Sequence, residues 1–149
     1  MRACTCSEQQ VRKYQQRLSG PMLDRFDIQL DVQRVDYDQL TDKRYGEPSS
    51  QIQARVEAAR ELQRLRYKTL PGILTNSDLG AGEIDQFCKL EGAADNLLKA
   101  ALRKLQLSAR AYHRVLKVSR TIADLAESDA IRTEHVAEAV QYRSRTLLT

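Results

Sequence analysis

Apolar residues recur at helical spacing over most of the chain from residue 50 onward, and this periodicity constrains the fold more than any other feature. Apolar side chains three and four positions apart share one face of a helix, which must then be buried against a neighbour. Several short amphipathic helices can close their apolar faces on one another as a bundle. The sequence therefore predicts a mainly α fold.

Capping and helix-breaking residues divide this region into separate predicted helices. A helix N-terminus is stabilised by a Ser or Thr side chain, and Gly or Pro ends a helix. The expected boundaries are a capping box of Ser50 and Gln53, a break at Pro71-Gly72, a helix end at Gly92, and helix starts at Ser108 and Thr133.

The first 35 residues have a different pattern. Ser7 and Gln10 form a predicted capping box that opens a helix to about Leu18, and Gly20-Pro21 is expected to end it. Apolar and polar residues then alternate from 26 to 32, which predicts a half-buried strand with Phe26, Ile28, Leu30 and Val32 on one face. A lone strand is unstable in water, so its partner strands are expected to lie outside this sequence.

Residues 36–50 are polar and contain Gly46 and Pro48, which predicts a linker. The expected organisation is a helix–strand unit at 1–35, a linker at 36–50 and a helical bundle at 51–149. No apolar run approaches the roughly 18 residues of a membrane helix, and the N-terminus lacks the apolar core of a signal peptide. Three cysteines, an odd count, suit a reducing cytoplasm.

Arg25 lies in the stretch LSGPMLDRFDI, on a turn between the first helix and the predicted strand. An arginine on a rigid turn can reach a neighbouring subunit and neutralise charge on a transferring phosphoryl group. The alternative is an ion pair of Arg25 with Asp24 or Asp27, which flank it.

Arg110 and Arg114 are four residues apart at the start of the long predicted helix and therefore share a face. The free N–H groups and positive dipole of a helix N-terminus also suit a phosphate. The alternative is a solvated basic face. The net charge of +4 and the pI near 9.1 indicate a polyanionic partner, nucleotide or nucleic acid, or simply an arginine-rich surface.

Cys4 and Cys6 form half of a zinc site, because structural zinc requires four ligands. Any zinc bound by this pair alone is expected to be weak. Cys88 lies on an apolar helix face and is interpreted as a packed core thiol, and His135 as a surface or capping residue.

No G-x-x-x-x-G-K-[ST] motif is present, and no catalytic triad can be assembled around His113 or His135. The chain alone is therefore expected to be inactive as a hydrolase, to bind ATP at most weakly, and to have no ATP or magnesium cofactor of its own.

The order of motifs closely resembles one known family. It runs from C-x-C through RxYQxRLSGPMLDRFDI, a variable linker and several helices to LSARAYHRVLKVSRTIADLAES and IRTEHVAEAVQYR. This is similar to the C-terminal part of the magnesium-chelatase-like AAA+ ATPases, in particular their competence-linked branch. The resemblance covers nearly the whole chain and is densest at residues 4–32 and 105–143.

The resemblance implies roles that spacing alone does not. Residues 1–35 would be the end of an α/β ATPase core, and the later helices its lid. Arg25 would be an arginine finger, and Arg110 would contact nucleotide phosphate as the sensor-2 arginine. Arg114, on the same helix face, is expected to contact the phosphate beside it. Cys4 and Cys6 would be the second of two cysteine pairs. The Walker motifs, with their ATP and magnesium, would lie before Met1.

The expected partners are other subunits of a homo-oligomeric ring, and DNA. Two alternatives remain open at this level. The chain could be a free-standing basic helical module that binds nucleic acid or protein, or the lid of an ATPase that inserts a metal into a tetrapyrrole.

Overall fold

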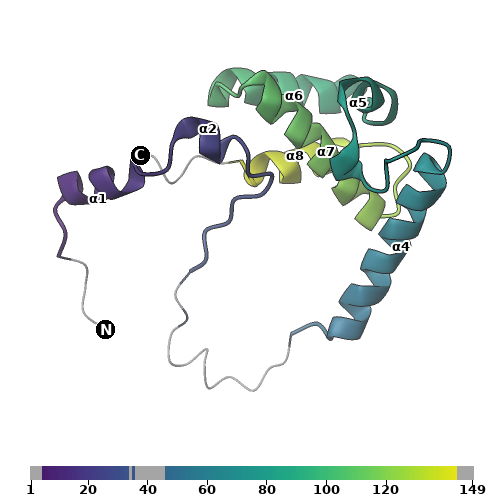
Figure 1. Ribbon diagram of the computed structural model, residues 1–149, viewed down its shortest axis with the longest axis horizontal. Coiled ribbons are helices and arrows are strands. Elements are labelled where there is room, and N and C mark those ends of the chain that lie inside the picture. Colours follow the sequence, from purple (N-terminus) through teal and green to yellow (C-terminus); the bar gives the residue numbers. More distant parts are fainter. Residues whose placement is uncertain (1–4, 34, 36–45, 144–149) are drawn as a thin grey trace.

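The computed structural model describes residues 5–33, 35 and 46–143, and this part of the chain is mainly helical (Figure 1). The predicted mainly α class is therefore confirmed. The elements in chain order are α1 (Glu8–Gln15), α2 (Gly20–Leu23), α4 (Ser49–Tyr67), the 3₁₀ turn η1 (Asn76–Asp78), α5 (Ala81–Phe87), α6 (Gly92–Leu105), α7 (Ala109–Leu125) and α8 (Thr133–Gln141).

Helix α7 is the centre of the bundle. It packs against α4, η1, α5 and α8, and α6 packs on α8 (Figure 1). The largest apolar side chains that are almost fully buried come from α4, α6, α7 and α8: Tyr67, Leu98, Val115 and Val136. Burial of each such side chain stabilises the fold by about 1.5–3 kcal/mol. The apolar faces predicted from 50 onward therefore do close on one another.

Two predicted helix starts are confirmed and two boundaries are wrong. Helix α7 begins after Ser108, whose Oγ accepts a hydrogen bond from the N–H of Ala111, and α8 begins at Thr133. The expected capping box at Ser50 is absent, because α4 begins at Ser49 after Pro48, whose fixed φ of −62° already suits a helix entry. Gly92 does not end a helix but is the first residue of α6. Its φ of +53° lies in the left-handed region, which favours glycine at this position.

The N-terminal segment follows its prediction only in part. Ser7 and Gln10 form the expected reciprocal capping box on α1. Gly20-Pro21, however, lies inside the short helix α2, which is capped by Ser19. The chain therefore leaves α1 before these two residues, and proline occupies a first-turn position where its missing N–H costs nothing.

The strand predicted at 26–32 is not formed, and the described residues contain no β-strand. The apolar side chains of this segment stay largely exposed, from 46% for Phe26 to 86% for Val32. A strand requires a neighbouring strand for its backbone hydrogen bonds, and none is present in the described part of the chain. The predicted linker lies mostly outside the described residues, and its last two positions, 49 and 50, belong to α4.

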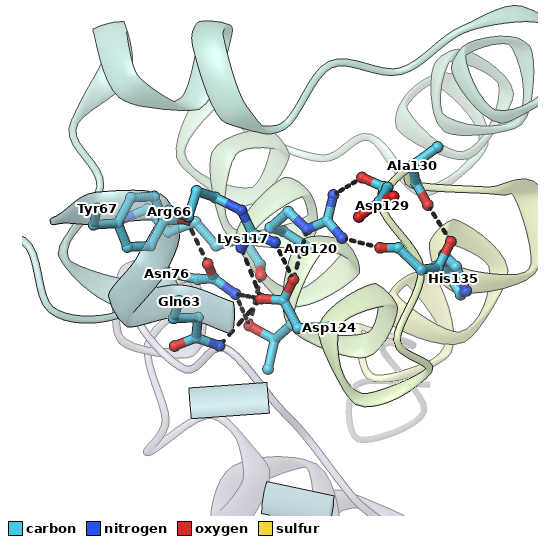
Figure 2. Close-up of polar contacts among 12 residues, drawn as sticks. Gln63, Arg66, Tyr67, Asn76, Lys117, Arg120, Asp124, Asp129, Ala130 and His135 are labelled. Carbon is cyan, nitrogen blue, oxygen red and sulfur yellow. Dashed lines mark hydrogen bonds and ion pairs between the residues drawn. The ribbon is translucent and has the colours of Figure 1, made fainter. Parts of the chain in front are cut away.

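A buried carboxylate holds the bundle together. Asp124, on α7, is fully buried and accepts hydrogen bonds from two arginines: both terminal nitrogens of Arg66 on α4, at 3.0 and 2.6 Å, and Nε of Arg120, at 3.1 Å. The amides of Asn76 and Gln63 donate to the same carboxylate at 2.8 and 3.2 Å (Figure 2). One side chain thus joins α4, η1 and α7.

The contacts of Asp124 extend into the loops on both sides. Tyr67 donates to Asn76 at 2.6 Å, and Asn76 donates to Thr121 at 2.9 Å. Arg120 donates to the backbone carbonyls of Ser128 and Asp129, which fixes the turn between α7 and α8 (Figure 2). Burial lowers the pKa of Arg66, but its interactions with Asp124 and Tyr67 together outweigh this effect and raise the pKa. Arg66 therefore stays charged.

Asp124→Ala should lower the free energy of unfolding by about 3–5 kcal/mol, because Arg66 and Arg120 would keep buried charges without a counterion. Urea unfolding followed by circular dichroism measures this. The matched control is Asp85→Ala, which removes an exposed carboxylate from α5 and should change the stability by less than about 0.5 kcal/mol. Equal effects of the two substitutions would show that the buried carboxylate is not the anchor.

Cys88 is confirmed as a core thiol, with only 2% of its surface exposed. Burial raises its pKa to about 11. The buried thiol is neutral, so its contribution to stability is fully present below its unfolded pKa of about 8.5 and is lost as the pH rises toward 11.

Cys88 should therefore react with iodoacetamide at pH 8 at least tenfold more slowly in the folded protein than in 6 M guanidinium, since only the exposed thiolate reacts. Peptide mass spectrometry of timed samples gives both rates for this one cysteine. Similar rates in the two states would contradict its burial.

No helix in the described part of the chain combines the length and the apolar character that crossing a membrane requires.

Candidate functional site

One face of α7 carries a row of cationic side chains. Arg110, Arg114 and Lys117 lie at spacings of four and three, so they project from the same side of the helix. The opposite side of α7 is buried in the bundle through residues such as Ala111 and Val115. Packing of α7 thus directs its basic face outward.

This basic face borders a groove of about 850 Å³. Its lining is largely apolar and comes from η1, α5, α7, α8 and the extended segment after α2. The principal lining residues are Asp27, Ile28, Leu30, Leu79, Ile84, Arg110, His113, Arg114, Lys117, Val118, Ile122, Glu138 and Tyr142.

The three cations of the groove differ in their partners. Arg114 forms an ion pair with Asp27, at 2.5 Å between Nη1 and Oδ1. Lys117 donates from Nζ to the backbone carbonyl of Ser77 at 2.9 Å. Arg110 is exposed and has no hydrogen-bond or ion-pair partner among the described residues. Of the three, Arg110 therefore keeps its guanidinium donors available for a ligand.

The groove is only weakly positive. Its three cations face two carboxylates, those of Asp27 and Glu138, which leaves one net positive charge when His113 is neutral. Glu138 already accepts a hydrogen bond from the Tyr142 hydroxyl at 2.9 Å, and this bond raises the pKa of Tyr142. An anion in the groove would consequently be drawn toward the Arg110 end.

Arg25 lies on the turn after α2 and is exposed. The two aspartates that flank it have other partners: Asp24 accepts from the hydroxyl of Ser108 at 3.0 Å, and Asp27 pairs with Arg114. Neither forms an ion pair with Arg25 in the described structure. The alternative that explained Arg25 as the partner of these two aspartates is therefore wrong.

Two of the three arginines predicted to contact phosphate, Arg110 and Arg114, line the groove. They share one face of α7, as predicted. Arg25 is not among the described residues that line the groove.

The remaining predicted site residues have no metal-binding arrangement in the described structure. Cys4 lies outside the described residues, and Cys6 is exposed. No group of three or more His, Cys, Asp or Glu side chains within the described ranges could hold a metal ion. His135 is 5% exposed and its Nδ1 accepts a hydrogen bond from the N–H of Arg132, so the capping interpretation is confirmed and the surface one is wrong.

Sequence reasoning missed the contacts between the N-terminal segment and the bundle. Asp24 and Ser108 are 84 positions apart, and Asp27 and Arg114 are 87 apart. Asp24 and Asp27 carry no local signal that favours a distant partner over the adjacent Arg25. The docking of this segment on α7 is what gives the two aspartates their distant partners in place of Arg25.

The sequence is matched by two models of one known family. The family model described as magnesium chelatase, subunit ChlI C-terminal, matches residues 46–143, and the model described as magnesium chelatase, subunit ChlI, matches residues 1–40. The chain belongs to this magnesium chelatase ChlI family.

Individual relatives are also similar over nearly the whole chain. Competence protein ComM of Haemophilus influenzae is 44% identical over 144 residues, and the uncharacterized protein YifB of Escherichia coli is 44% identical over 140 residues. The uncharacterized protein Rv2897c of Mycobacterium tuberculosis is 32% identical over 140 residues. These matches cover 93–95% of this chain but 27% of each relative, so the chain spans about a quarter of their length.

Proposed function

We propose that this chain is the C-terminal lid region of a ring-forming AAA+ ATPase, in which it couples ATP binding and hydrolysis to movement of the ring. The relatives are about four times as long as this chain, which leaves room for an ATP-binding core in the same polypeptide. Arg110 would contact the γ-phosphate of the nucleotide, and Arg114 would support it. Arg25 would act as an arginine finger on a neighbouring subunit.

The observation that carries this proposal is the availability of both arginines. Arg66, Arg114 and Arg120 pair with carboxylates inside the described structure. Arg25 and Arg110 are exposed and form no such pair there. A guanidinium without a counterion can take a phosphate without first breaking an internal ion pair.

The donor set also fits a phosphate of ATP. Arg110 stands on the first turn of the 17-residue helix α7, where the helix dipole adds positive potential. ATP and magnesium would supply the phosphoryl group and the charge-neutralising cation. The helices described here would bind and orient that phosphate.

We further propose that the ring acts on DNA. One similar protein is named competence protein ComM, and the resemblance of this chain to the competence-linked branch of the family favours DNA. The net charge of +4 supports a polyanionic partner. Other subunits of the same ring would be the protein partners of this region.

The 149-residue chain by itself should bind ATP no more tightly than about 1 mM, because Arg110 is the one groove cation that is not already paired within the described residues. Titration with ATP and magnesium, followed by amide chemical shifts, should move signals at the start of α7. Arg110→Ala should remove these shifts, and Arg103→Ala, an exposed substitution on α6, should not. Micromolar binding would show that the chain carries a nucleotide site of its own.

In the longer ATPase, Arg25→Ala should lower ATP turnover by roughly 10³–10⁵-fold, the usual effect of removing an arginine finger, without unfolding the lid. Mixing Arg25→Ala subunits with subunits that have a defective Walker motif shows whether Arg25 acts on the nucleotide of a neighbouring subunit, in trans, or on that of its own subunit, in cis. Activity should return at interfaces where an intact Arg25 meets an intact nucleotide site. Mixed rings that assemble normally but stay inactive would refute the assignment in trans.

A further inference from the structure

The segment around Arg25 is held against the bundle at four points. Each contact joins one residue of the segment to α7 or to the C-terminal end of α8, and the two sides are more than 80 positions apart in sequence. The pairs are the side chains of Asp24 and Ser108, the carbonyl of Phe26 and Nη1 of Arg143, the side chains of Asp27 and Arg114, and the N–H of Gln29 with the carbonyl of Tyr142.

These contacts fix the residues on either side of Arg25 and leave Arg25 itself exposed. Gln29 also closes the segment on itself, because its Nε2 donates to the carbonyl of Leu23 at 3.1 Å. The backbone of the turn is therefore immobilised while its one arginine points away. An arginine that must meet a phosphate on another subunit requires this kind of fixed base, since a displacement of 1 Å can cost about 10²-fold in rate.

Arg143 is the most deeply buried of the bundle residues that contact this segment. It is 4% exposed, and it donates from Nη1 to the carbonyl of Phe26. Its Nη2 is buried and has no hydrogen-bond partner within the described part of the chain. Burial lowers the pKa of Arg143, although the nearby carboxylates of Asp24 and Asp27 raise it.

A buried guanidinium that has a hydrogen-bond partner for Nη1 and none for Nη2 contributes little to the stability of the fold. Unpaired buried donors destabilise a fold, and an apolar side chain of similar volume is often neutral or better. The presence of arginine at this position thus calls for another explanation. The one hydrogen bond that its side chain makes within the described residues is to the carbonyl of Phe26, the residue that follows Arg25.

We propose that Arg143 is a positioning residue for Arg25: by holding the carbonyl of Phe26, it fixes the turn from which Arg25 reaches the neighbouring nucleotide. This inference rests on the proposed function of Arg25. The contacts of Asp24 with Ser108 and of Asp27 with Arg114 tie the same turn to α7, which also carries Arg110. Arg110, which would contact the nucleotide of its own subunit, and Arg25, which would contact the neighbour's nucleotide, then move together as one rigid unit.

Arg143→Met tests the clamp, because methionine keeps the length and apolar bulk of the side chain and removes every donor. In the 149-residue chain, amide exchange of Gln29 should become at least tenfold faster, while exchange of Val115 in the core stays the same. Arg143→Lys, which retains a donor, should restore part of the protection. Arg103→Met is the matched control and should change neither rate. Unchanged exchange of Gln29 in Arg143→Met would overturn the clamp.

The same variants in the longer ATPase test the positioning role. Arg143→Met should lower kcat by about 10²-fold and leave the ATP concentration at half-maximal rate and ring assembly unchanged, and Arg143→Lys should recover part of kcat. If Arg25→Ala abolishes turnover and Arg143→Met does not affect it, the positioning role is wrong and the arginine finger stands. If Arg25→Ala also leaves turnover intact, the proposed function is wrong and this inference with it.

Discussion

The arrangement of this bundle depends on one buried negative charge. Asp124 has no exposed surface, so its charge is tolerable only if donors surround it completely. Five nitrogens from four side chains do so, and they come from α4, η1 and α7. Apolar packing would permit α4 to slide or rotate on α7 at little cost. The two-point contact of Arg66 with this carboxylate permits one register only.

The sequence was sufficient for features that depend on residues close together along the chain. The capping of α7 by Ser108, the capping box of Ser7 and Gln10, and the apolar faces of the later helices are all local patterns. The predicted helix boundaries were wrong where one residue suits two different positions in a helix. Gly92 can end one helix or precede another, and only the packing of α6 against α8 selects the second.

Features that depend on distant residues were not predictable. Nothing near Asp124 indicates that Arg66, 58 positions earlier, will face it across the bundle. Asp24 and Asp27 were candidate partners of Arg25 because they are its neighbours in sequence, yet both bond to α7. The alternation of apolar and polar residues at 26–32 predicts a β-strand. A β-strand is stable only beside another strand, and the described residues contain no strand. The roles of Arg25 and Arg110 came from a family resemblance, and the structure adds that both arginines are exposed.

The anchor at Asp124 lies at one end of α4, and this has a mechanical consequence. The buried positions of α4 are Ala59, Gln63 and Tyr67, whereas its first ten residues, 49–58, are all exposed (Figure 1). These ten residues form a rod about 15 Å long that is fixed to the bundle only at its far end. A 10° rotation of the bundle would carry the free tip of α4 through about 2.6 Å. Helix α4 is therefore a lever whose pivot lies where its burial begins, at Ala59, and whose exposed end is at Ser49.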